Sequence, residues 1–288
     1  MSKTTTSGRS SFGIPPPAFR LPEAARVGAA HLQVVNLQRS LSYYEQVLGL
    51  RRHAVTDDSA VLSAHGDERP LVILHTRPGV ERARRGVFGL YHFAILLPER
   101  GALGRFATHL ASLEVRVGMA DHSVSEALYL WDPDGLGIEV YADRAPETWQ
   151  RHGRELVMTT DPLDIRSVIA SGRGKIWTGA PEGTTLGHVH LHVGGMEQAE
   201  AFYHRALGLD KTVWSYPGAL FMSAGGYHHH LATNTWSTGP AAAVNEARLL
   251  EWELVVPSDI ELDAAARNLR DAGHDITKTE TGVAVADP

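Results

Sequence analysis

Residues 186–209, LGHVHLHVGGMEQAEAFYHRALGL, repeat the pattern of residues 27–50, VGAAHLQVVNLQRSLSYYEQVLGL. The offset is constant at 159 positions, since Gly187 corresponds to Gly28 and 187 − 28 = 159. Each segment opens with alternating apolar and polar residues, which predicts a half-buried strand, and continues as an amphipathic helix. Each helix ends at Leu-Gly-Leu, where glycine suits the helix C-cap. The chain therefore contains an internal duplication.

A second repeated pair lies between these segments. Residues 90–98 read LYHFAILLP and residues 249–257 read LLEWELVVP, again offset by 257 − 98 = 159. Both are followed by a helical pattern and then by a strand with a turn, LYLWDPDG in one copy and VAVADP in the other. Repeats of this kind are structural units that pack on one another. The sequence predicts an α+β fold of four βαβββ modules in the order A, B, A′, B′.

These modules suggest a division of the chain into segments. Residues 1–22 are rich in Ser, Thr, Gly and Pro, and we expect a disordered or extended N-terminal arm. Residues 23–150 are expected to form an N-terminal domain of two modules, residues 151–185 a linker, and residues 186–288 a C-terminal domain of two modules. The last strand of the fourth module is expected to be incomplete, because the sequence stops at Pro288.

The composition excludes several kinds of site. The 288 residues have 43% hydrophobic content and a net charge of −6, without the basic domain that nucleic-acid binding usually requires. The chain has no cysteine, which rules out disulfides, thiolate ligands and cysteine nucleophiles. No stretch reaches the roughly 18 apolar residues of a membrane span. We therefore expect a cytoplasmic protein with no nucleic-acid or membrane partner.

The sixteen histidines are the unusual feature of the composition, because histidine is the commonest metal ligand. Three of them alternate along one predicted strand, at His188, His190 and His192, opposite an apolar face that would pack on the helix. The face that carries the histidines must therefore contact something other than this helix.

Several motifs carry a resemblance to a known family. The H-x-x-L-x-V opening strand, the A-F-Y-x-x-x-L-G-L helix end and the D-P-D-G-x-G-I-E-V-Y closing strand resemble the vicinal oxygen chelate superfamily. The segments GLYHFAILLP, VSEALYLWDPDGLGIEVYADR and SAGGYHHHLATNTW are similar to tandem catechol-2,3-dioxygenase-like proteins of bacteria. The resemblance runs from about residue 26 to the C-terminus. It implies that the modules form two cupped mixed-sheet barrels.

The resemblance also implies a metal site, because ligands in this superfamily come from the first and last strands of paired modules. The matching positions here are His92, Glu139 and His188. These lie in the second and third modules, so we expect those two modules to pair. The alternative is a site within residues 186–288 that uses Glu251 with His188 and His230. Two imidazoles and one carboxylate form the facial triad typical of Fe(II), with Mn(II) as the alternative metal.

Candidate acid–base residues lie close to these positions. If Leu231 packs on the helix, His228 and His230 face the cavity, and His230 would suit either a fourth ligand or a proton shuttle. We rank His230, His228 and Tyr141 as proton shuttles in that order. His122 is a further candidate, as a pocket lid, with a plain loop position as its alternative.

The resemblance and the triad together predict a metal-dependent extradiol ring-cleaving dioxygenase, acting on a catechol-like aromatic diol with O₂. Two alternatives stay open. One is a non-oxidative metalloenzyme of the same fold, either a glyoxalase-like isomerase or an epoxide-opening transferase. The other is a small-molecule binding protein. The oligomeric state is also open at this point; exposed sheet edges in this fold often favour dimers, so a homodimer is one candidate assembly.

Overall fold

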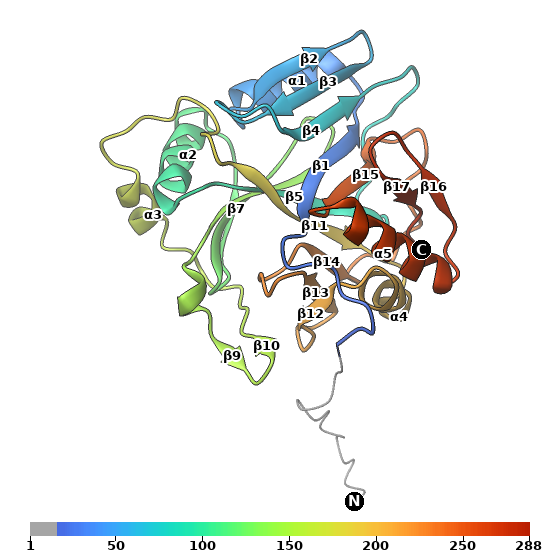
Figure 1. The fold of residues 1–288 in the computed structure, drawn as a ribbon. Coiled ribbons are helices and arrows are strands. Elements are labelled where there is room, and N and C mark those ends of the chain that lie inside the picture. Colours follow the sequence, from blue (N-terminus) through green and yellow to red (C-terminus); the bar gives the residue numbers. More distant parts are fainter. Residues whose placement is uncertain (1–15) are drawn as a thin grey trace, which may run out of the picture.

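The computed structural model describes residues 16–288, which fold into four successive modules (Figure 1). The first comprises β1 (Arg26–Gln33), α1 (Leu37–Gln46), β2 (Arg51–Val55), β3 (Ser59–Ser63) and β4 (Pro70–His75). The second comprises β5 (Gly89–Leu96), α2 (Arg100–Ser112), β6 (Gly118–Asp121), β7 (Ser125–Trp131) and β8 (Gly137–Asp143). The third comprises β11 (Thr185–His192), α4 (Met196–Ala199), the π-helical η2 (Glu200–Ala206), β12 (Asp210–Val213), β13 (Ala219–Ser223) and β14 (Leu231–Asn234). The fourth comprises β15 (Arg248–Val255), α5 (Asp259–Asp271), β16 (Ile276–Lys278) and β17 (Val283–Val285).

The second and third modules share one curled eight-stranded sheet, in the order β12-β13-β14-β11-β5-β8-β7-β6. They join where β5 runs antiparallel to β11. The prediction that the second module pairs with the third is therefore confirmed. Histidine-bearing strands from the two halves of the sequence lie side by side at the centre of this sheet.

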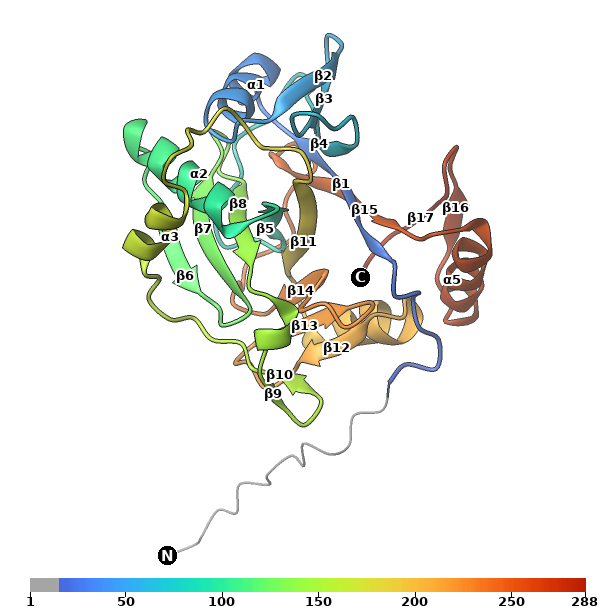
Figure 2. The ribbon, with the colours of Figure 1, turned by 60° about the vertical axis from the view of Figure 1, so that its left-hand side comes forward.

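The first and fourth modules meet in a separate five-stranded sheet, in the order β15-β1-β4-β3-β2. Strands β16 and β17 pair only with each other, and with α5 they stand to one side of the molecule (Figure 2). Each large sheet thus combines a module from each half of the sequence.

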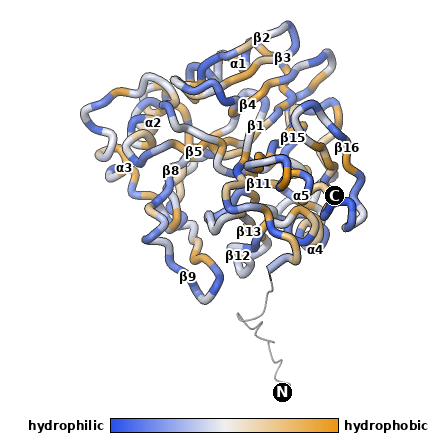
Figure 3. The backbone as a smooth tube through the Cα atoms, in the orientation of Figure 1, coloured by the Kyte–Doolittle hydropathy of each residue, from blue (hydrophilic) through white to orange (hydrophobic). Residues whose placement is uncertain are grey.

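The core lies where the apolar faces of the sheets meet their helices. Phe93 and Ile95 of β5 are 0% and 2% exposed, and the ring of Tyr44 on α1 stacks on Phe93 at 6.4 Å. This contact joins the first and second modules through the core. Hydrophobic positions gather along the central strands, whereas peripheral loops such as the one beside β9 are hydrophilic (Figure 3).

The connection from the second module to the third has secondary structure of its own. It contains η1 (Pro146–Thr148), β9 (Arg151–His152), β10 (Glu155–Leu156) and α3 (Ile165–Ser171). Helix α3 packs closely on α2, since a side chain at Gly104 would collide with the Val168 carbonyl. The predicted arm falls partly outside the described residues, which begin at 16. Within the described part, the Leu21 N–H donates to the Gly208 carbonyl at 3.0 Å. No helix of residues 16–288 is long and apolar enough to cross a membrane.

The D-P-D-G turn between β7 and β8 is a structural clamp. Asp132 Oδ1 accepts the N–H groups of Asp134 and Leu136, at 2.9 and 2.8 Å, which fixes the turn. The carboxylate of Asp134 is fully buried, accepts the Val35 N–H at 2.8 Å and pairs with Arg39 at the start of α1. The turn therefore holds the first module against the second.

Asp134→Ala is expected to lower the free energy of unfolding by about 2 kcal/mol or more, because it removes the acceptor of Val35 and the partner of Arg39. The midpoint of urea unfolding measures this loss. The control is Glu45→Ala, which removes an ion pair with Arg52 at the surface and should leave the midpoint almost unchanged. A midpoint for Asp134→Ala equal to that of the control would disprove the clamp.

Candidate metal centre

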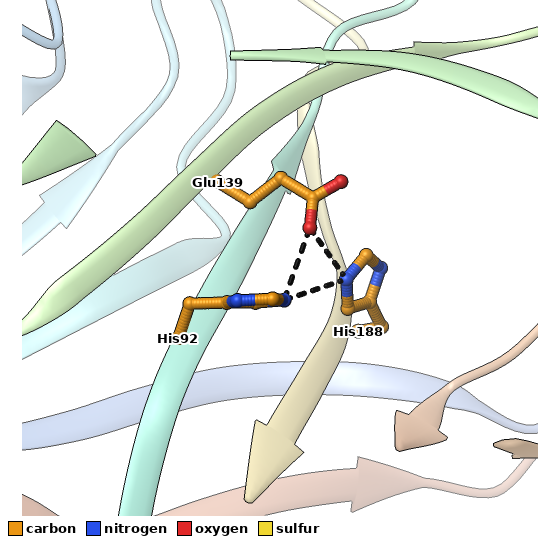
Figure 4. A group of neighbouring side chains, drawn as sticks. All are labelled: His92, Glu139 and His188. Atoms are coloured by element: carbon orange, nitrogen blue, oxygen red, sulfur yellow. Dashed lines mark hydrogen bonds and ion pairs between the residues drawn. The ribbon is translucent and has the colours of Figure 1, made fainter. Parts of the chain in front are cut away.

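Three neighbouring strands bring the predicted ligands together. His92 lies on β5, Glu139 on β8 and His188 on β11, and all three side chains point toward one another (Figure 4). Ala94 of β5 pairs in register with both Glu139 and His188. Its small side chain leaves room between the ligands.

The three donor atoms form a compact triangle. Glu139 Oε2 lies 3.0 Å from His92 Nε2 and 3.2 Å from His188 Nε2, and the two Nε2 atoms are 3.4 Å apart. Within residues 16–288, these are the His, Cys, Asp or Glu side chains whose donor atoms converge in a group of three. Ligands about 2.1 Å from a metal, at right angles to one another, lie about 3.0 Å apart. The donor set therefore fits a divalent metal on one face of its coordination sphere.

Burial and charge prepare these residues for a cation. All three residues are at most 5% exposed. Burial lowers the pKa of His188 to about 4, against the opposing effect of Glu139, so the imidazole is neutral near pH 7. Burial alone would raise the pKa of Glu139, but His188 and His92 hold it well below its usual range. Two neutral imidazoles and one buried carboxylate are the forms that bind metal, and a cation would offset the cost of burying the carboxylate.

Tyr141 is held against the triad by a glycine. Its ring centroid lies 5.0 Å from that of His188, and it is fully buried. A Cβ on Gly187 would overlap the Tyr141 hydroxyl. Gly187 is also the extra residue where the pairing of β11 with β5 shifts register. The bulge and the missing side chain together make space for Tyr141.

A chain of hydrogen bonds leads from Tyr141 back to the triad. The Tyr141 and Tyr227 hydroxyls are 2.7 Å apart, and Tyr227 donates to Asp143 Oδ2 at 3.0 Å. His228 Nε2 donates to Asp143 Oδ1 at 2.9 Å, and His228 Nδ1 lies 2.7 Å from His229 Nδ1. With one proton on each ring, His228 Nδ1 accepts from His229, which leaves His229 Nε2 unprotonated.

His229 is the residue that the sequence analysis missed. Its ring lies 4.0 Å from that of His188, whereas the His228 ring lies at 6.1 Å. His230 instead accepts the Ala224 N–H at Nδ1 and packs on Tyr227 at 5.1 Å. Regular strand begins only at Leu231, so alternation does not assign faces to the three histidines before it. The sequence pointed to His228 and His230 through strand alternation, whereas the ring of the histidine between them lies nearer to His188.

The other candidates occupy distinct places. Glu251 lies on β15 in the five-stranded sheet, with its side chain 63% exposed and 3.5 Å from His31. It is not part of the triad. His122 lies between Thr159, to whose carbonyl it donates at 2.6 Å, and the Tyr129 hydroxyl at 2.7 Å. The Tyr129 ring in turn lies 5.5 Å from His92, so His122 is two contacts from the triad.

His190 and His192 flank the site without joining it. The His190 ring lies 4.9 Å from His92, and its Nε2 accepts from the Asn234 amide at 2.9 Å. His192 Nδ1 donates to the same Asn234 side chain at 2.6 Å.

Comparison with known proteins agrees with this architecture. The chain is 44% identical over 272 residues to a protein of Bacillus subtilis (strain 168) named catechol-2,3-dioxygenase, a match that covers 92% of this chain and 95% of the relative. A solved structure from Bacillus subtilis subsp. subtilis str. 168, described as a candidate dioxygenase, superposes with a TM-score of 0.63 at 15% identity, covering 90% of this chain and 78% of that one. A mutant of glyoxalase I from Zea mays gives a TM-score of 0.55 at 18% identity, covering 92% of this chain and 89% of that one. These two structures share the fold.

A family profile matches both halves of the chain. It covers residues 26–140 and 185–284, which between them contain all three residues of the triad. The match spans more than half of the sequence. The chain belongs to the Glyoxalase/Bleomycin resistance protein/Dioxygenase superfamily.

Proposed function

We propose that this protein is a metal-dependent extradiol dioxygenase that cleaves a catechol-like aromatic diol with O₂. The observation that carries the proposal is the buried triangle of His92, Glu139 and His188, with donor atoms 3.0 to 3.4 Å apart. The 44% identity to a catechol-2,3-dioxygenase over most of the chain supports the reaction type.

The triad would hold Fe(II), with Mn(II) as the alternative, and leave the remaining coordination positions open. A bound Fe(II) supplies the Lewis-acid and redox chemistry that brings a diol and O₂ into reaction. The chain contributes the position of the diol and the handling of its protons. A cytoplasmic location and a homodimeric assembly stay predictions from the sequence.

Proton transfer would fall to the hydrogen-bonded chain beside the triad. The His229 ring lies 4.0 Å from the His188 ring, and the hydrogen bond to His228 leaves His229 Nε2 unprotonated. We therefore place His229 ahead of His228, His230 and Tyr141 as the group that accepts a diol proton. His228 and Asp143 would orient it, and the Tyr141 hydroxyl would hydrogen-bond the diol.

The alternatives receive less support from the geometry. A four-ligand site that included His230 would favour an isomerase or transferase, but His230 Nδ1 is engaged with the Ala224 backbone. A metal-free binding protein would have no use for a buried carboxylate between two imidazoles.

The test is oxygen uptake by protein loaded anaerobically with Fe(II), on addition of catechol. Uptake with a yellow ring-opened product is the expected result. Bound metal without uptake would instead favour the isomerase or transferase, and failure to bind metal would leave a binding protein.

A further inference from the structure

A β-bulge turns an additional aromatic side chain toward the triad. His190 of β11 pairs with His92 of β5, but the next residue, Leu191, pairs with Leu90. Tyr91 is thus the extra residue of β5, and a bulge re-aims the side chain that it carries. The Tyr91 ring consequently lies 4.9 Å from the neighbouring His92 ring and 5.0 Å from the His190 ring.

Tyr91 belongs to a cluster that we call the aromatic gate, which consists of Tyr91, Trp236, Tyr216 and Phe221. Trp236 lies 5.7 Å from Tyr91 and 6.3 Å from Tyr216, and Tyr216 lies 5.7 Å from Phe221. Tyr91 and Trp236 are 39% and 46% exposed, whereas Phe221 is 6% exposed. The gate therefore runs from the surface to the residues around the triad.

The gate is held in place rather than loosely packed. Asn234 Oδ1 accepts the Trp236 N–H at 3.1 Å while the same side chain bonds His190 and His192. The Trp236 indole N–H donates to the Pro217 carbonyl at 3.0 Å. The Tyr216 hydroxyl lies 2.8 Å from Thr160 Oγ1, in the connection between the second and third modules. Fixed aromatic faces of this kind suit the binding of flat apolar groups.

The charges around the gate disfavour an anionic substrate. The hydrogen-bond partners of the gate named above are a backbone carbonyl, a side-chain amide and a hydroxyl, and none of these is a cation. The carboxylate of Glu139 pairs with His92, whose ring contacts Tyr91. A substrate carboxylate at the gate would find no cationic partner among these groups, whereas an apolar substituent would cover the ring faces of Tyr91 and Trp236.

We propose that the aromatic gate selects uncharged diols with an apolar, preferably aryl, substituent, and that Tyr91 and Trp236 contact that substituent. This inference rests on the proposed function, because it names the substrate class of the same site. The diol oxygens would lie at the triad and the substituent would extend toward the exposed rings of Tyr91 and Trp236.

The test compares three diols that differ only at ring position 4: catechol, 4-phenylcatechol and 3,4-dihydroxybenzoate. For wild-type protein, kcat/KM for 4-phenylcatechol should equal or exceed that for catechol, and 3,4-dihydroxybenzoate should be at least about tenfold poorer. Tyr91→Ala and Trp236→Ala should each lower the ratio of kcat/KM for 4-phenylcatechol to kcat/KM for catechol about tenfold, chiefly through a higher KM for 4-phenylcatechol. The control is Trp131→Ala, which removes another tryptophan, 61% exposed at the end of β7.

Binding is measured in parallel by calorimetry on protein loaded with redox-inactive Zn(II), so that the inference can be tested without turnover. An equal loss for catechol and 4-phenylcatechol would assign Tyr91 and Trp236 a structural role only, and would overturn the inference. Efficient binding of 3,4-dihydroxybenzoate would overturn it as well. If no diol is oxidised but the calorimetric preference for 4-phenylcatechol depends on the gate, the proposed reaction fails and the inference stands.

Discussion

Glu139→Ala is expected to weaken metal binding by at least about 100-fold, as are His92→Ala and His188→Ala. Replacing a residue that only orients a metal ligand typically lowers metal affinity 10- to 100-fold. These three residues supply the converging donor atoms themselves, so we expect a larger loss. The measurement is the metal content of each variant after anaerobic loading and dialysis, together with a competition titration against a chelator. All three variants should lose metal to a similar extent, because each removes one corner of the same triangle.

The matched control for this series is Glu251→Ala. Glu251 is the residue that corresponds to His92 in the repeat, but it lies on β15 in the other sheet, beside His31. Its variant should keep full metal content. Full occupancy in either His92→Ala or Glu139→Ala, or loss of metal in Glu251→Ala, would contradict a site shared between the second and third modules.

The repeat made most of the fold predictable. The two halves of the sequence place matching residues at matching positions of the two sheets, down to the irregularities. The β1–β15 pairing shifts register near Gly28 as the β11–β5 pairing does near Gly187. The triad was predictable because strand alternation puts His92 and Glu139 opposite apolar residues that pack on the helices. The position of an inward-facing residue on a regular strand follows from the pattern alone.

Side-chain directions could not be predicted where the backbone is irregular. The residues before β14 do not form regular strand, so alternation could not show that His229, rather than His228 or His230, approaches His188. The direction of the Tyr91 side chain could not be predicted for a different reason. Tyr91 lies in a regular strand, but a bulge turns it onto the face of His92. Both depend on local register, which hydrophobic patterning does not encode.

The connection between the second and third modules was expected to be a linker. Its contacts with the third module could not be predicted from the sequence. Glu155 of β10 is buried and accepts the N–H groups of Trp214 and Ser215, at 2.7 and 2.6 Å. These bonds fasten the connection to the third module. Such partners are far apart in sequence and follow no period.

Asp143→Asn is expected to lower kcat about 100-fold while metal content stays at the wild-type level. Asp143 accepts hydrogen bonds from His228 and Tyr227, and through His228 it sets which nitrogen of His229 is free of a proton. An asparagine amide can donate to His228 Nε2, which reverses the direction of the bonds along the chain and places a proton on His229 Nε2. General acid–base groups typically contribute 10²- to 10⁴-fold to rate, and loss of the correct tautomer removes much of that contribution.

The control separates this positioning effect from a general loss of structure. Asp121→Asn changes a carboxylate on β6, in the same sheet, that pairs with Arg144 at 2.5 Å and has no bond to the histidines of the chain described above. Its kcat should stay within about threefold of wild type. KM should stay close to the wild-type value in both variants, because Asp143→Asn leaves the metal ligands and the gate in place and so should change kcat far more than KM. If Asp143→Asn lost metal in proportion to activity, or if KM alone rose, Asp143 would act by supporting the sheet rather than by orienting His229.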